Sequence, residues 1–153
     1  MQSTTDVVTC TECGRRNRVQ RSATGIPRCG HCHTPLPWIV DASDDDYDEI
    51  VGSSTIPVLL DLWAPWCGPC RFVSPALERL AVTHAGRVKL LKVNVDEAPA
   101  IAERFGVRGI PTLIVLDGDE VVARQTGAPP EDALQAWLAD ALGVHQSMQD
   151  ANG

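Results

Sequence analysis

The sequence contains no run of about 18 consecutive apolar residues, the minimum for a helix that crosses a membrane. Its first residues, 1–8, have neither a basic start nor an apolar stretch, so we expect no secretory signal. We therefore expect the chain in the reducing cytoplasm, without a membrane partner, where paired cysteines usually bind a metal or carry out redox chemistry. With 44% hydrophobic and 22% charged residues, the 153-residue chain is typical of one globular domain with a small extension.

Residues 1–36 also have few large apolar side chains, too few to fold on their own. Such a segment needs a bound metal, and structural zinc supplies roughly 10–16 kcal/mol of folding free energy in small zinc peptides. Five arginines against two acidic residues make this segment basic, although the whole chain has a net charge of −7. A basic module can contact nucleic acid, but these arginines are not interleaved with aromatic side chains that would stack on bases. We therefore expect no nucleic-acid partner.

The six cysteines fall into three Cys-x-x-Cys pairs, and the first two pairs are separated by 15 residues. This is the spacing of a four-cysteine zinc site, here Cys10, Cys13, Cys29 and Cys32. A closed site of four sulfurs leaves no open position, so we expect one structural zinc ion in a small zinc ribbon. Gly14 and Gly30 should relieve its tight turns. His31 or His33 could replace a thiolate, although a surface position is the simpler expectation, and the thiolates could also be oxidised with metal release.

The third pair is enclosed in Trp66-Cys67-Gly68-Pro69-Cys70, directly after an apolar run. A strand followed by a helix would place Cys67 beside the free amides and positive end of the helix, which stabilise a thiolate. We expect Cys67 to be the attacking nucleophile and Cys70, one turn along and deeper, to resolve the mixed disulfide. Gly68 and Pro69 let the chain enter the helix tightly. A metal knuckle or two buried thiols are the alternatives, but no further pair remains to complete a second zinc site.

Beyond residue 37 the apolar pattern predicts the order β-α-β-α-β-α-β-β-α. The expected strands are 38–40, 57–63, 88–95, 112–116 and 120–126, and the expected helices are 44–51, 67–84, 99–105 and 130–142. Phe72 and Leu77 lie at helical spacing on one apolar face, and Pro75 should kink that helix. Alternation of strands and helices, followed by a hairpin at Asp117-Gly118, predicts an α/β sandwich with a mixed sheet between helices. The expected units are a zinc ribbon (1–36), a main domain (37–143) and a disordered tail (144–153) after Gly143.

Residues 38–142 resemble the thioredoxin family. The resemblance rests on Trp63-Ala64-Pro65-Trp66-Cys67-Gly68-Pro69-Cys70 and on Asp61, Pro75, Lys92, Gly109-Ile110-Pro111-Thr112 and Gly127. With the four-cysteine extension, the chain resembles the bacterial thioredoxin 2 subgroup. The resemblance implies a thioredoxin-like three-layer sandwich and a protein-disulfide reductase that acts on cytosolic proteins through Cys67 and Cys70. It also implies a redox-active Cys67–Cys70 disulfide, restored to the dithiol by an NADPH-dependent thioredoxin reductase. We expect the protein to be a monomer.

The resemblance further implies roles for residues around the dithiol. Asp61 should lie buried beneath Cys70 and exchange a proton with it, because burial raises the pKa of a carboxyl group. Lys92 resembles the family's buried partner of that carboxylate; the alternatives are a solvated edge position for Asp61 and an exposed strand position for Lys92. Ile110-Pro111 resembles the family's cis peptide bond, beside which the substrate backbone pairs. The implied substrate-binding residues are Trp66, Gly68, Pro69, Gly109, Ile110, Pro111, Gly127 and Ala128.

Two other classes of function stay open at this point. The basic ribbon could be a docking module that carries a redox-regulated fold to a partner. The chain could instead be a holdase chaperone that uses the apolar groove. Loss of insulin reduction in a Cys67→Ser variant would favour the enzyme, whereas unchanged client binding in that variant would favour either alternative.

Overall fold

The computed structural model of the chain describes residues 5–152. From Ile39 onward, strands and helices follow one another in the predicted order, after a two-stranded hairpin in the cysteine-rich segment. The elements are β1 (Thr5–Thr9), β2 (Arg16–Gln20), β3 (Ile39–Ala42), α1 (Tyr47–Ser53), β4 (Val58–Trp63), α2 (Cys70–Thr83), β5 (Lys89–Asn94), α3 (Pro99–Arg104), β6 (Thr112–Asp117), β7 (Glu120–Thr126) and α4 (Glu131–Asn152).

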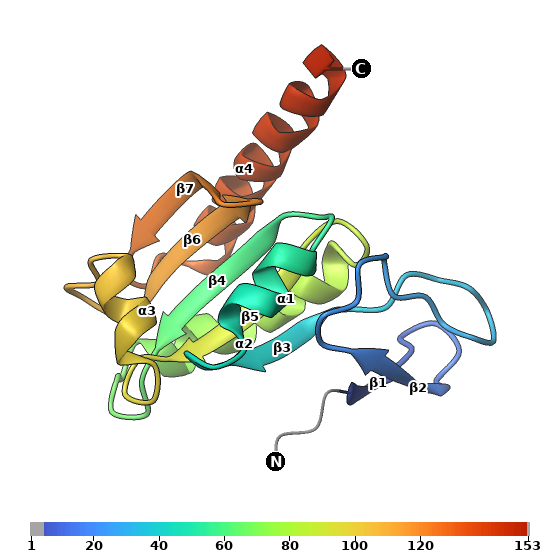
Figure 1. Cartoon of the computed structure of the whole chain (residues 1–153), viewed down its shortest axis with the longest axis horizontal. Helices are drawn as coiled ribbons and strands as arrows, with labels where there is room; N and C mark the ends of the chain where they lie inside the picture. Colours follow the sequence, from blue (N-terminus) through green and yellow to red (C-terminus); the bar gives the residue numbers. More distant parts are fainter. Residues whose placement is uncertain (1–4, 153) are drawn as a thin grey trace.

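The main sheet has five strands in the order β3-β5-β4-β6-β7 (Figure 1). β3 and β4 both pair in parallel with β5, because helices cross over between these strands. β6 runs antiparallel to β4 and to β7, since a tight turn that includes Gly118 joins β6 directly to β7. The mixed sheet predicted from the sequence is therefore confirmed.

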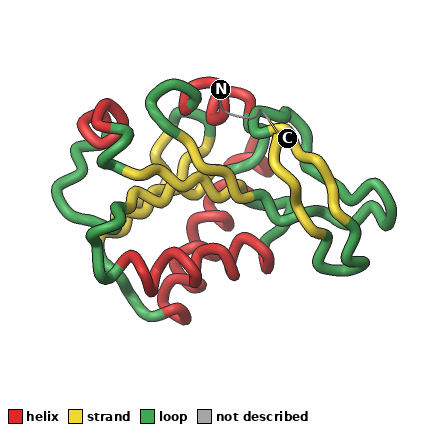
Figure 2. Tube along the Cα trace, turned by 90° about the horizontal axis from the view of Figure 1, so that it is seen from below, coloured by secondary structure: helices red, strands yellow, loops and turns green. Residues whose placement is uncertain are grey.

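Helices cover both faces of this sheet, which gives three layers (Figure 2). Successive residues of a strand point to opposite faces, and the buried side chains divide accordingly. Leu60 of β4 belongs to the apolar cluster that contains Ile50 of α1 and Ile101 of α3. Leu59 belongs to a second cluster, which contains Leu77 of α2 and residues of α4. β4 is thus buried on both faces, which explains its near-continuous apolar sequence.

The cysteine-rich segment packs directly against the main domain. β1 and β2 lie beside the edge of the sheet that β3 forms (Figure 1). Cys10, Cys29 and Leu36 are buried in the same apolar cluster as Trp38 and Val40 of the main domain. The two segments therefore share one core, and the boundary at residue 36 stays a prediction about the chain's organisation.

Three details of the predicted elements are corrected. Phe72 is 78% exposed, so it lies outside the core, while Val73 and Leu77 are buried. α1 begins at Tyr47 because Asp44–Asp46 form a turn first, in which the Asp46 carboxylate accepts the backbone N–H of Ser43 at 2.7 Å.

The third correction concerns the end of the chain. α4 does not end at Gly143 but continues to Asn152, so the backbone of residues 144–152 is helical. The assignment of residues 144–153 to a separate tail stays a prediction. A glycine inside a helix costs only about 1 kcal/mol relative to alanine, and no proline follows it. The end of α4 projects beyond the sheet (Figure 1). Neither α4 nor another helix within residues 5–152 is long and apolar enough to cross a membrane.

Candidate active site and metal centre

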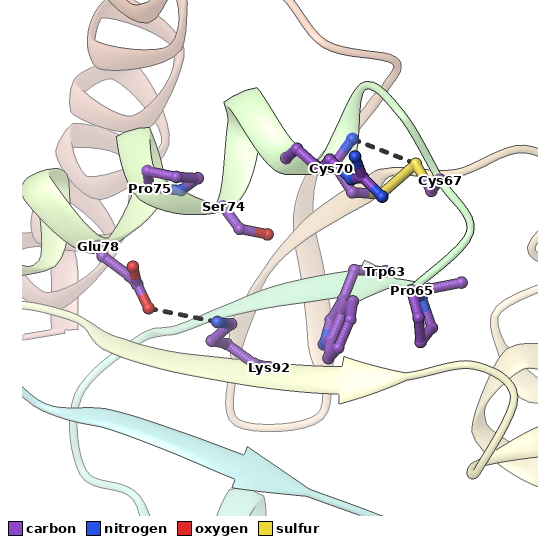
Figure 3. Close-up of a pocket in the computed structure, with 10 residues that line it drawn as sticks. Trp63, Pro65, Cys67, Cys70, Ser74, Pro75, Glu78 and Lys92 are labelled. Atoms are coloured by element: carbon purple, nitrogen blue, oxygen red, sulfur yellow. Dashed lines mark hydrogen bonds and ion pairs between the residues drawn. A yellow bond between two sulfur atoms is a disulfide. The ribbon is translucent and has the colours of Figure 1, made fainter.

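Cys67 and Cys70 form a disulfide at the junction between β4 and α2 (Figure 3), with Cα atoms 5.4 Å apart. Cys70 is the first residue of α2, and Pro69 caps the helix. The backbone N–H of Cys70 donates a hydrogen bond to Sγ of Cys67 at 3.2 Å. We expected Cys70 to lie deeper than Cys67. The two residues are instead buried to the same degree, 4% exposed for Cys67 and 3% for Cys70, so burial does not distinguish them. The amide at the start of the helix does, because it points at Cys67.

Asp61 lies in the middle of β4 and is fully buried. Its Oδ2 accepts a hydrogen bond from the hydroxyl of Ser74 at 3.0 Å. Burial raises the pKa of Asp61 to about 6, although the Ser74 hydrogen bond and then the charge of Lys92 act in the opposite direction. The expectation of a buried carboxyl group is thus met, whereas the exposed edge position is wrong. A pKa near 6 allows this group to gain and lose a proton close to neutral pH.

Lys92 of β5 lies opposite Asp61 in the parallel pair β4–β5. Its ammonium group does not pair with Asp61 but with Glu78 of α2, at 3.2 Å (Figure 3). The Lys92 side chain is 19% exposed, so it is neither fully buried nor a solvated strand lysine. The expected direct pairing of Lys92 with Asp61 is therefore corrected: Lys92 pairs with Glu78, and it acts on Asp61 through its charge, which lowers the pKa of that carboxyl group.

A cavity of 330 Å³ lies between α2 and the sheet, next to the disulfide (Figure 3). Its walls include both cysteines, the Ser74 hydroxyl and the Lys92–Glu78 pair. Trp63 lines the same cavity and packs against the cluster formed by Ala64 and the disulfide. The disulfide thus connects to a partly polar space that could admit water and protons.

The Ile110–Pro111 peptide bond is cis, as the resemblance implied. Ile110 packs against the disulfide cluster, and the carbonyl of Pro111 accepts the backbone N–H of Gly127 at 2.9 Å. Gly127 has a φ of 98°, a conformation that favours glycine. Gly109 lies close to Thr126 of β7. These contacts bring the cis proline and the two expected glycines to the end of the sheet that carries the dithiol.

Gly68, Pro69 and Ala128 line a second cavity, of 680 Å³, on another side of the α2 start. The exposed Phe72 also lines this cavity, and sequence reasoning missed it as a surface residue because it follows the helical apolar spacing. Trp66 is 69% exposed. Two large aromatic side chains near the dithiol in sequence, Trp66 and Phe72, are thus exposed, and Phe72 lines the cavity beside the Gly68-Pro69 turn.

Asp96 is a further residue that the sequence did not single out. The indole N–H of Trp66 donates to both of its carboxylate oxygens, at 3.2 and 3.0 Å. Asp96 follows β5, and Trp66 precedes the dithiol, so the pair ties the active-site loop to the next part of the sheet. The two residues are 30 positions apart, so no local sequence pattern predicts their contact.

The other four cysteines come together in the amino-terminal segment. The sulfurs of Cys10, Cys13, Cys29 and Cys32 all lie within 4.8 Å of one another. Two of the sulfur–sulfur distances, Cys10–Cys32 and Cys13–Cys29, are 3.6 and 3.5 Å. Zinc–sulfur bonds of about 2.3 Å in a tetrahedron give sulfur–sulfur edges of about 3.8 Å. The cluster therefore has the size of a closed four-sulfur metal site.

The two turns that carry these cysteines have related backbones. The residue after the second cysteine of each pair has a positive φ, 76° at Gly14 and 65° at His33. His33 therefore takes the conformation that we assigned to Gly30, which lacks it. The backbone N–H of Gly30 instead donates to the side chain of Asn17 at 2.9 Å. Among the described residues, the clustered ligand atoms are the four sulfurs, and neither histidine belongs to the group.

The electrostatics of the quartet favour a bound cation. Hydrogen bonds, first of all from the backbone of Cys32, lower the pKa of Cys29 to about 5. The pKa of Cys13 is raised to about 12: the backbone amide of Arg15 lowers it, but desolvation and the neighbouring sulfurs outweigh that effect. Four thiolates this close repel one another, and a divalent cation removes that conflict. The donor set thus fits a metal ion that holds all four sulfurs ionised.

Comparisons with known proteins agree with this geometry. The model of the thioredoxin family matches residues 38–140. A thioredoxin of Haemophilus influenzae is 48% identical over 100 residues, which cover 65% of this chain and 94% of that protein. Thioredoxin C-3 of Corynebacterium nephridii is 34% identical over 143 residues, 92% of this chain and 98% of that protein, so its match extends into the cysteine-rich segment. It follows that the chain belongs to the thioredoxin family of thiol–disulfide oxidoreductases.

Proposed function

We propose that this chain reduces disulfide bonds in cytosolic proteins by dithiol exchange, with Cys67 as the attacking sulfur and Cys70 as the resolving sulfur. The observation that carries the assignment is the hydrogen bond from the Cys70 amide to Cys67 Sγ at the start of α2. A sulfur that accepts a helix-terminal N–H is stabilised as a thiolate, which is the nucleophilic form.

The reaction proceeds in two balanced steps. In the first, the Cys67 thiolate attacks one sulfur of the substrate disulfide; a mixed disulfide forms and the other substrate sulfur leaves as a thiolate. In the second, Cys70 loses its proton and attacks Cys67; the bond between Cys67 and the substrate breaks, and the second substrate sulfur leaves as a thiolate that takes a proton from solvent. The substrate gains two electrons, and the Cys67–Cys70 pair ends in the disulfide that the structure contains.

Asp61 is proposed to accept the proton of Cys70 in the second step. Cys70 and Ser74 lie one turn apart on α2 and so on the same face, and Ser74 contacts Asp61 directly. The raised pKa of about 6 supports the role, because the group can return the proton to solvent near neutral pH. Lys92 is proposed to assist through its charge, which lowers the pKa of Asp61.

The substrate is proposed to lie as an extended segment across the cis proline. The expected groove residues are Trp66, Gly68, Pro69, Gly109, Ile110, Pro111, Gly127 and Ala128. The backbone of Ile110 would pair with the substrate in the manner of an added strand. The packing of Ile110 against the disulfide supports this placement, because a segment paired there passes within reach of Cys67.

The cycle is proposed to close with an NADPH-dependent thioredoxin reductase, which returns two electrons to the disulfide. Thioredoxins in general act on protein disulfides and are reduced by such enzymes. A cytoplasmic location and a monomeric state agree with this role. The extension is proposed to bind one zinc ion through Cys10, Cys13, Cys29 and Cys32, as in the thioredoxin 2 subgroup. Such an ion supplies folding free energy, and the reduction does not pass through it.

Two matched variants test the proposal by insulin reduction with dithiothreitol or with the reductase system. Cys67→Ser should lose activity by more than about 100-fold and form no mixed disulfide. Cys70→Ser should also lose turnover, but it should accumulate a covalent mixed disulfide with the substrate, visible by mass spectrometry. The assignment of roles is wrong if the trapped adduct forms at Cys70 in the Cys67→Ser variant instead. Retained client binding with no reduction by the wild type would favour the docking or chaperone alternatives.

A further inference from the structure

One face of α2 carries a row of three polar or reactive residues. Cys70, Ser74 and Glu78 follow at intervals of four residues and line the same cavity between α2 and the sheet (Figure 3). Ser74 donates to Asp61 of β4 at 3.0 Å, and Glu78 pairs with Lys92 of β5 at 3.2 Å. α2 therefore makes one polar contact with β4, through Ser74, and one with the neighbouring strand β5, through Glu78.

This arrangement gives Asp61 a partner other than the lysine. Because the Lys92 ammonium is bound to Glu78, the direct hydrogen bond to Asp61 comes from Ser74. The second carboxylate oxygen, Oδ1, is buried and has no hydrogen-bond partner among residues 5–152. Asp61 thus has one oxygen, Oδ2, that accepts a hydrogen bond from Ser74, and a second oxygen, Oδ1, that accepts none from the described residues.

Resting on the role proposed above for Asp61, we infer that Ser74 is a positioning residue for the resolving step: its hydroxyl holds Oδ2 of Asp61 so that Oδ1 receives the proton of Cys70. In that step the Cys70 S–H bond breaks and an Oδ1–H bond forms on Asp61. The Cys70 thiolate attacks Cys67, so the Cys67–Cys70 bond forms, the bond between Cys67 and the substrate breaks, and the substrate sulfur leaves as a thiolate. The proton then leaves Asp61 for solvent on the side of Ser74, which contacts Asp61 and lines the cavity.

Among the groups around Asp61, Ser74 has a large effect on the pKa of its carboxyl group. After burial, which raises the pKa of Asp61, the Ser74 hydrogen bond is the strongest influence and lowers it. Lys92 on β5 lowers it further and Glu78 on α2 raises it, so the two members of that ion pair oppose each other. Arg71 of α2 also lines the cavity. On the other side, β6 presents the apolar Leu113 opposite Asp61.

Removal of the hydroxyl should therefore move the titration of Asp61 in a defined direction. A hydrogen bond to a carboxylate stabilises the charged form, so Ser74→Ala should raise the titration midpoint of the Asp61 carboxyl by about one pH unit or more. Carbon NMR of the carboxyl groups in the oxidised protein measures this midpoint without any catalysis. Ser74→Thr keeps the hydroxyl and should restore the wild-type midpoint.

The rate of insulin reduction should follow the same shift. If the ionised Asp61 accepts the proton, a midpoint raised by one unit makes Ser74→Ala about fivefold slower at pH 6 and equal to wild type above about pH 8. Thr83→Ala is the matched control, because its hydroxyl lies on the same helix but donates to the backbone of Arg79. This control should move neither the titration nor the rate profile.

Further outcomes separate a failure of the inference about Ser74 from a failure of the proposed role of Asp61 as proton acceptor. An unchanged Asp61 midpoint in Ser74→Ala overturns the inference, whatever the activity. A shifted midpoint with an unshifted rate profile overturns it too, and shows that the fault lies in the proposed role of Asp61. In an Asp61→Asn background, Ser74→Ala should have no further effect on the pH profile; an effect that persists there would show that Ser74 acts by another route.

Discussion

The ammonium group of Lys89 donates a hydrogen bond to the backbone carbonyl of Arg21, the residue after β2, so the central sheet holds the ribbon directly. Lys89 is fully buried in β5, and its Nζ lies 3.8 Å from the centroid of the Trp38 ring. Arg21 in turn pairs with Asp6 of β1 at 3.2 Å and approaches Asp46 before α1 to 3.9 Å. The ribbon and the main domain are thus joined by charged contacts as well as by a shared core.

The burial of Lys89 predicts a dependence of stability on pH. Burial lowers its pKa from an ordinary 10.5 to about 8. Between these values the unfolded chain binds the proton and the folded chain does not, so the free energy of unfolding should rise with pH from 8 to 10.5. Lys89→Met keeps the apolar stem and should remove this rise. Urea denaturation of both proteins at pH 8 and pH 10 measures how much the free energy of unfolding of each protein rises with pH. An equal rise in both proteins would mean that Lys89 is hydrated in solution.

Metal removal should destabilise the whole molecule and not the ribbon alone. Cys10 and Cys29 are buried in one cluster with Trp38, so loss of the metal loosens a core that the sheet shares. A strong chelator should lower the melting temperature by several degrees and change the tryptophan fluorescence. Cys10→Ser should reproduce both effects and abolish binding of the proposed zinc ion. Cys67→Ser should keep one zinc per chain. A ribbon that unfolds with no change in the main transition would contradict a shared core.

Asp61→Asn should make the protein more stable at neutral pH while it slows reduction. The pKa of Asp61 is raised from 3.8 to about 6, so the folded state binds the proton more tightly than the unfolded state. The resulting stability is present below pH 4 and is lost as pH rises through 6, which leaves an ionised carboxylate buried at pH 7. Asparagine removes that penalty, roughly 2–3 kcal/mol. Denaturation curves at pH 4 and pH 7 should show the gain at pH 7 only; a gain of equal size at both would exclude an ionisation effect.

Phe72 and Leu77 provide a matched test of which face of α2 is buried. Phe72 is 78% exposed and Leu77 is 0% exposed. Phe72→Ala should therefore change the free energy of unfolding by less than about 0.5 kcal/mol, whereas Leu77→Ala should cost about 2–5 kcal/mol. Phe72→Ala should instead weaken the binding of protein substrates, because the ring lines the cavity beside Gly68. Insulin kinetics and urea titrations measure the two effects separately.

The contact between Trp66 and Asp96 predicts an effect on substrate binding. Asp96→Ala removes both acceptors of the indole N–H, so the exposed Trp66 ring loses its fixed orientation. We expect the KM for insulin to rise by about two- to fivefold, with stability changed by less than about 1 kcal/mol because the contact is exposed. Glu97→Ala is the control, since Glu97 is the adjacent exposed acidic residue. A lower kcat with an unchanged KM would contradict a role in binding.

Most of the secondary structure was predictable because its causes are local. The apolar run before Cys67 predicted a strand buried on both faces, and Asp117-Gly118 predicted the turn between β6 and β7. The spacing of the four ribbon cysteines predicted their cluster. Errors arose where the local pattern allows two outcomes: Phe72 fits the helical spacing of the core but faces solvent, and Gly143 resembles a helix end but lies within α4.

Sequence alone determined the chemistry of this chain, because a dithiol at a helix start and a four-sulfur quartet depend on short spacings. Tertiary structure decided which groups control that chemistry. Ser74 and Asp61 are 13 residues apart, and Lys89 and Arg21 are 68 apart. Such pairs meet only after the sheet assembles. No local spacing indicates that Ser74 binds Asp61 while Glu78 binds Lys92; the packing of α2 on the sheet settles it.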